Sequence, residues 1–187
     1  SDKLIALQPG NPVAWSDRGS LLAAMGRHKE AWACFDKALA IEPDLADAWF
    51  ASGMLYSSFL QHEAALKCSR RVFALQPGNA EASCRLAEAL RRLGRDEEAL
   101  AAFQETLKID KDFPFVRTQV AWLKLHRCNW EGVDTDIEAT LHAVREGKRA
   151  GPPLDLLAMT GSAEDQLGCA RTFATHMYPP PPATLWQ

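Results

Sequence analysis

Apolar side chains recur every three or four residues along most of this 187-residue chain, which is the spacing of one face of an α-helix. One such stripe consists of Ala31, Trp32, Phe35, Ala38 and Leu39. A second, further along, consists of Val133, Ile137, Leu141 and Val144. This pattern predicts that the chain is all-α.

The helical pattern repeats with a step of 34 residues. Trp15 and Trp49 are separated by this step, and so are the glycines and alanines that follow them. The prolines that share the step are Pro9, Pro43 and Pro77, and a third copy is marked by Ala87, Gly94, Ala99 and Phe103. A fixed step of this length predicts an array in which each repeat is one pair of helices.

These positions resemble the signature of the tetratricopeptide repeat (TPR). The first full repeat carries it as Trp15, Gly19, Leu22, Ala31, Phe35, Ala38 and Pro43, and the second as Trp49, Gly53, Tyr56, Ala65, Val72 and Pro77. The second repeat departs from the pattern at Ser69, where an aromatic residue is usual, and the third departs at Ser83 and Lys111. The resemblance implies a right-handed solenoid of stacked antiparallel helix pairs.

Small residues and helix breakers have clear roles in such a stack. Gly19 and Gly53 are expected where the first helix of a repeat crosses the second, because a side chain there would keep the helices apart. Gly26 and Gly94 fit the left-handed position that ends a helix. The residue before a proline avoids the helical region, so Pro43 ends the second helix of its repeat.

The register of the repeat predicts four segments. Residues 1–10 align with the end of a second helix and are interpreted as the truncated end of a preceding repeat. Residues 11–113 form three TPR repeats, residues 114–147 a divergent helical hairpin, and residues 148–187 a linker with short helices and a Pro-rich tail. A truncated end exposes apolar surface, so a homo-oligomer that pairs through this end is one possible assembly.

The carboxyl-terminal third is predicted to contain further helices. Their expected ranges are Phe113–Leu125, Glu131–Arg145, Leu154–Met159 and a helix from Ser162 to about Met177. Ser162 and Asp165 have the spacing of a capping box at the start of the last helix. Together with Cys128-Asn129-Trp130 and the prolines at 179–182, this order resembles the segment that follows the repeats in bacterial O-GlcNAc transferases and SPINDLY-type proteins. The usual aspartate of that turn is Asn129 here.

Composition narrows the classes of function. The formal net charge of −3 gives no attraction to nucleic acid or to anionic lipid, and no apolar run is long enough for a membrane span. Five cysteines without a CxxC pair indicate thiols in a reducing compartment, so a cytoplasmic location is expected. His28 and His62 occupy equivalent turns and are interpreted as solvated residues, not metal ligands. No catalytic residue, metal site or cofactor is predicted.

Binding is the function that the sequence favours. In TPR arrays the first helix of each repeat lines a concave groove, and the register assigns to it Ser16, Asp17, Ser20, Asp47, Phe50, Met54, Glu81, Arg85, Glu88 and Arg92. We expect a protein-protein interaction scaffold that holds a protein or an extended peptide in this groove. The alternative is the substrate-recruiting part of an O-linked GlcNAc-type glycosyltransferase whose catalytic domain lies outside this sequence.

Overall fold

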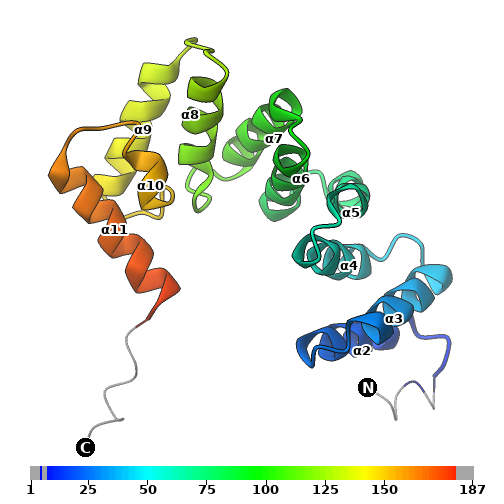
Figure 1. Cartoon of the computed structure of the whole chain (residues 1–187). Helices are drawn as coiled ribbons and strands as arrows, with labels where there is room; N and C mark the ends of the chain where they lie inside the picture. The colour runs from blue at the N-terminus through cyan, green and yellow to red at the C-terminus, as the bar shows by residue number, and fades with distance from the viewer. Residues whose placement is uncertain (1–4, 6–7, 180–187) are drawn as a thin grey trace, which may run out of the picture. The chain divides into compact units, whose positions relative to one another are not determined.

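A computed structural model describes residue 5 and residues 8–179, and every regular element in those ranges is an α-helix. The chain forms two compact units, Ser1–Ala102 and Phe103–Gln187 (Figure 1). The prediction of an all-α fold is confirmed. The predicted helix end within residues 1–10 and the Pro-rich tail fall mainly outside the described residues.

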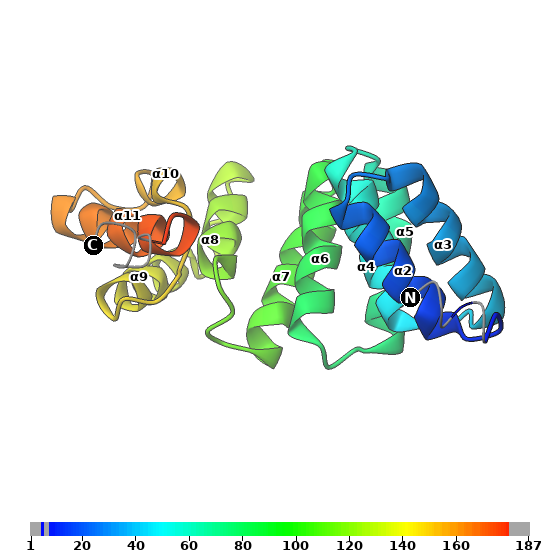
Figure 2. The ribbon, with the colours of Figure 1, turned by 90° about the horizontal axis from the view of Figure 1, so that it is seen from below.

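The first unit contains successive antiparallel helix pairs, and α7 ends beyond it. The helices are α2 (Pro12–Ala24), α3 (His28–Ile41), α4 (Ala46–Ser58), α5 (His62–Leu75), α6 (Ala80–Arg92) and α7 (Asp96–Ile109). Their lengths alternate between 13 and 14 residues, and the first helix of each pair begins 34 residues after the one before it. Helix α4 contacts both α2 and α3, and α5 contacts α6, so the pairs in this unit are stacked (Figure 2).

Helix ends follow the predicted residues. Gly26 and Gly94 have φ angles of 75° and 70°, which are left-handed values that glycine adopts without steric cost. The equivalent position of the middle repeat is Leu60, which also has a positive φ, of 56°. The side chains of Asn11 and Asn79 accept hydrogen bonds from the first backbone amides of α2 and α6 and so cap these helices.

The signature residues of a repeat contact one another in the structure, through close packing and through hydrogen bonds. A Cβ atom at Gly19 would lie 2.6 Å from Cε1 of Phe35, whose side chain is only 1% exposed. The glycine therefore permits the close crossing of α2 and α3. The indole nitrogen of Trp15 donates to the carbonyl oxygen of Pro9 at 2.9 Å, and that of Trp49 to Pro43 at 2.8 Å. Each of these tryptophans thus ties its helix to the proline that precedes it.

Among its described residues, the second unit contains the end of α7 and four further helices, α8 (Val116–His126), α9 (Val133–Arg145), α10 (Pro153–Leu156) and α11 (Ala163–Met177). The prediction that a helix begins at Phe113 is wrong, because Phe115 has a left-handed φ of 66° that no α-helix accommodates. The helix predicted at Leu154–Met159 is shorter than expected. Beyond Leu156 the chain continues as turns, with hydrogen bonds from residue 157 to 154 and from 158 to 155.

Two of the ion pairs in the second unit join different helices. The guanidinium of Arg145 on α9 donates two hydrogen bonds, of 2.8 and 2.7 Å, to the carboxylate of Asp165 on α11. Lys124 on α8 donates to Asp136 at 2.5 Å. Half of the predicted capping box is confirmed, because the hydroxyl of Ser162 accepts from the amide of Asp165. The carboxylate of Asp165 binds Arg145 and so serves the packing of α9 against α11.

Candidate functional site

The residues assigned to the groove lie on the first helices of the three pairs. Asp17 and Ser20 are exposed on α2, and Asp47 is exposed on α4. Ser16 does not fit the prediction: it is 6% exposed, because it lies one turn before Gly19 on the side of α2 that packs inside the unit. A ligand could therefore reach almost none of its surface.

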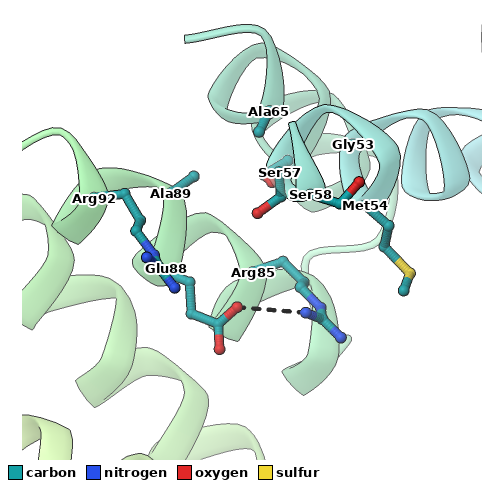
Figure 3. A pocket seen from close by; sticks show the side chains of 10 residues that line it. Gly53, Met54, Ser57, Ser58, Ala65, Arg85, Glu88, Ala89 and Arg92 are labelled. Carbon is teal, nitrogen blue, oxygen red and sulfur yellow. Dashed lines mark hydrogen bonds and ion pairs between the residues drawn. The ribbon is translucent and has the colours of Figure 1, made fainter. Parts of the chain in front are cut away.

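A pocket of about 340 Å³ opens in the first unit beside α4 and α6 (Figure 3). It is lined by Gly53, Met54, Ser57, Ser58, Ala65, Ser69, Arg85, Glu88, Ala89 and Arg92. The structure therefore brings together four of the predicted groove residues, namely Met54, Arg85, Glu88 and Arg92. The other predicted residues do not line this pocket.

The pocket lies where the middle repeat lacks a large aromatic side chain. Phe35 and Phe103, at the equivalent position of the neighbouring repeats, are each 1% exposed. The middle repeat has Ser69 there, and Ser69 lines the pocket together with Gly53 and Ala65. A serine fills far less volume than a phenylalanine, so the substitution leaves space at the crossing of α4 and α5.

The small residues of the lining were missed in the assignment from sequence. The signal that could have found them was the departure at Ser69 from the aromatic of the repeat pattern. Because a serine stands where the neighbouring repeats have a phenylalanine, that departure indicates empty space beside α5, one turn after Ala65. Ser57 and Ala89 carry no comparable signal in the sequence.

The rim of the pocket carries both signs of charge. Arg85 donates to Glu81 at 2.8 Å and to Glu88 at 3.4 Å, and its guanidinium carbon lies 5.8 Å from the centre of the Phe50 ring. These contacts fix the position of the Arg85 side chain, and the two carboxylates offset its positive charge. Arg92 is exposed, and no ion pair joins it to another described residue. It is therefore a cation available to a ligand at this rim.

The thiols near the pocket are poor nucleophiles. Burial, together with the carboxylates of Glu88 and Glu81, raises the pKa of Cys84 to about 12. Burial also raises the pKa of Cys68, whose Cβ lies 3.0 Å from the position of a Cβ at Gly53. Both thiols remain protonated near neutral pH, and a thiol reacts as a nucleophile only in its thiolate form.

His28 packs against a neighbouring aromatic side chain. The interpretation of His28 as a solvated turn residue is wrong, because its ring packs edge-on against Phe59 with 4.8 Å between the ring centres. Within residues 8–179 no group of three or more His, Cys, Asp or Glu side chains is placed to hold a metal ion. None of the described helices combines the length and the apolar character that crossing a membrane requires.

Comparisons with known proteins agree on the repeat. Residues 12–55 and residues 61–123 each match a sequence model of the tetratricopeptide repeat. No curated protein sequence matches the chain. One similar solved structure is YrrB, described as a TPR protein with an unusual peptide-binding site, with a TM-score of 0.70, 16% identity, and coverage of 96% of this chain and 92% of that chain.

Two structures of the protein MamA are also similar. One has a TM-score of 0.70 and 17% identity and covers 78% of this chain and 85% of that chain. The other, residues 41 to the end of MamA from Desulfovibrio magneticus RS-1, has a TM-score of 0.68 and 20% identity and covers 76% of this chain and 80% of that chain. At these identities the likeness concerns the fold alone.

Proposed function

We propose that this chain, in which residues 12–55 and 61–123 are tetratricopeptide repeats, is an interaction scaffold that binds an extended peptide across α4 and α6. The observation that carries the proposal is the pocket that Ser69 leaves open beside Arg92. The description of YrrB as a peptide-binding TPR protein is consistent with this use of the fold.

The ligand that suits this site has a large apolar side chain close to an acidic one. The apolar side chain enters the pocket past Met54, and burying it contributes about 1.5 to 3 kcal/mol. The acidic group binds Arg92 at the rim, because Arg85 is already held by two carboxylates. Glu88 on the same rim disfavours a second acidic group beside it. An extended peptide presents these two side chains a short distance apart, as the site requires.

The test uses peptides selected from a random library on the immobilised protein. We expect the selected peptides to share an aromatic or long aliphatic residue close to Asp or Glu. Ser69→Phe fills the pocket with the side chain that the neighbouring repeats carry, so it should preserve the fold and weaken binding about tenfold or more. Arg92→Glu should weaken binding to a similar extent.

The matched control is Lys67→Glu. Lys67 is exposed on α5, does not line the pocket, and undergoes the same change of charge as Arg92→Glu. Its binding should stay within about twofold of the unmodified protein, since an exposed charge outside the site contributes little. Equal loss in both glutamate variants, or undiminished binding by Ser69→Phe, would show that the peptides bind elsewhere.

The second candidate function is recruitment of substrates for an O-linked GlcNAc-type glycosyltransferase. It rests on the turn Cys128-Asn129-Trp130 and on the order of the elements that follow it, which include α10 and the capped α11. The family matches cover the repeats alone, so this function stays a prediction. Sugar transfer from a nucleotide donor by the natural full-length protein would establish it.

Location and self-association also remain proposals. We place the protein in the reducing cytoplasm because all five cysteines are free and four of them are buried. Pairing of two copies is proposed through the truncated amino-terminal end; Val13 and Leu21 on α2, the first described helix, are apolar side chains that are 51% and 56% exposed. A sedimentation experiment over a range of protein concentrations would test this pairing.

A further inference from the structure

A second pocket lies within the second unit, and none of its lining residues belongs to the pocket of the proposed function. Its volume is about 600 Å³. It is lined by Gly147, Arg149, Arg171, Thr172, Thr175 and His176. Two of these six residues are arginines and a third is a histidine, whereas no carboxylate is present in the lining. Such a composition favours an anion.

Arg149 is held in a defined position in this site. The backbone amide of Phe115 donates to its carbonyl oxygen at 2.6 Å, and its guanidinium carbon lies 5.9 Å from the centre of the Phe115 ring. Its Nη1 atom lies 3.1 Å from the ring nitrogens of His176. The His176 ring in turn packs against Phe115, with 5.8 Å between the ring centres. Phe115 is therefore a platform that places two basic side chains together.

The carboxylates closest in the sequence to these residues are engaged by other cations. Lys148 pairs with Glu146 at 2.9 Å and with Asp112 at 3.1 Å. The carboxylate of Asp165 accepts hydrogen bonds from Nε and Nη2 of Arg145. Arg171 is exposed on α11, and no ion pair joins it to another residue in the described part of the chain. No ion pair within the described residues neutralises Arg149 or Arg171; Arg171 also lines a neighbouring pocket together with Glu164 and Asp165.

We propose that Arg149 and Arg171 form a binding site for a phosphate monoester group. The guanidinium fork matches the paired oxygens of a phosphate, which accepts two parallel hydrogen bonds from it. Thr172 and Thr175 form a polar wall, and their hydroxyl groups donate to the carbonyl oxygens of Gly168 and Arg171. The affinity therefore comes from the arginines and should fall as salt is added.

The test is a titration of the whole chain with inorganic phosphate and, separately, with phenyl phosphate, followed in ¹H–¹⁵N spectra. Saturable shifts of the amide signals of Gly147, Thr172 and Thr175 are expected. Arg171→Gln should weaken phosphate binding about tenfold, which is the effect of losing one hydrogen bond to a charged group. The Arg171 side chain joins no ion pair within the described residues, and Arg171→Lys, which keeps the charge but not the fork, should bind with intermediate affinity.

The matched control is Arg27→Gln, which removes one positive charge from an exposed pair with Glu30 in the first unit. It should leave phosphate binding unchanged. Tighter binding of phenyl phosphate than of inorganic phosphate is expected for a monoester site, and equal or weaker binding would show that the site takes the free anion instead. Shifts that do not saturate, or the same affinity in Arg171→Gln and Arg27→Gln, would overturn the proposal.

Discussion

Replacing Gly19 by alanine tests whether the signature glycine is required by packing. In the interior of a helix, alanine is favoured over glycine by about 1 kcal/mol. The added Cβ would lie 2.6 Å from Cε1 and 2.8 Å from Cδ1 of Phe35. The ring is 1% exposed and so is surrounded by other atoms, and overpacking at such a position costs about 1 to 3 kcal/mol. We expect Gly19→Ala to lower the free energy of unfolding by up to about 2 kcal/mol.

Gly168→Ala is the matched control. Gly168 is also inside a helix, but the nearest atom to its added Cβ is Cγ1 of Val144 at 3.7 Å, an ordinary contact distance. This variant should gain about 0.5 to 1 kcal/mol. Urea unfolding followed by circular dichroism measures both. If the clash is the cause, the shorter side chain of Phe35→Leu should remove most of the penalty of Gly19→Ala in a double-mutant cycle. A Gly19→Ala variant as stable as Gly168→Ala would refute the reasoning.

Three other predictions follow from single residues. Leu60→Gly should raise stability by about 0.5 to 1 kcal/mol in urea unfolding, because Leu60 is exposed and holds the left-handed conformation that Gly26 holds in its repeat; lower stability would contradict this. The hydrogen bonds from Arg145 hold the pKa of Asp165 below its ordinary value, so the pair stabilises the fold fully above about pH 4 and less as the pH falls through the lowered pKa. Asp165→Asn should therefore have a lower free energy of unfolding at pH 7 and should lose less of it as the pH is lowered. If the free energy of unfolding of Asp165→Asn falls with pH as steeply as that of the unmodified protein, this role of the pair is excluded. Cys128 is the exposed cysteine, so one thiol per chain should react with a thiol reagent under native conditions, and rapid reaction of several thiols would show that the other four are not buried.

The repeat made most of the fold predictable. A 34-residue step in Trp15, Gly19 and their equivalents specified the helix pairs, and the structure begins α2, α4 and α6 with that same step. Local chemistry gave the helix ends, since Gly26 and Pro43 act through backbone conformation, which depends little on distant contacts. These parts could be predicted because each repeat shows the same residue types at the same positions, so the helix boundaries are indicated more than once.

Features that depend on a single residue in its surroundings could not be predicted. Nothing in the local pattern indicates that Phe115 adopts a left-handed φ, and this conformation delays the start of α8. His28 was interpreted from its place in a turn, whereas its surroundings are set by Phe59 of the next helix pair. The pocket likewise depends on the large side chain that is absent at Ser69, and the match of the other signature positions carries no information about that space.

The measurement that tests the central claim most directly is the location of a library-selected peptide on the protein. Amide shifts in ¹H–¹⁵N spectra report which helices the bound peptide contacts. We predict that the largest shifts fall on Met54 and Ser57 of α4 and on Ala89 and Arg92 of α6, and that they disappear in Ser69→Phe. Shifts confined to other helices, or shifts at these residues that persist in Ser69→Phe, would contradict the claim that this pocket binds the peptide.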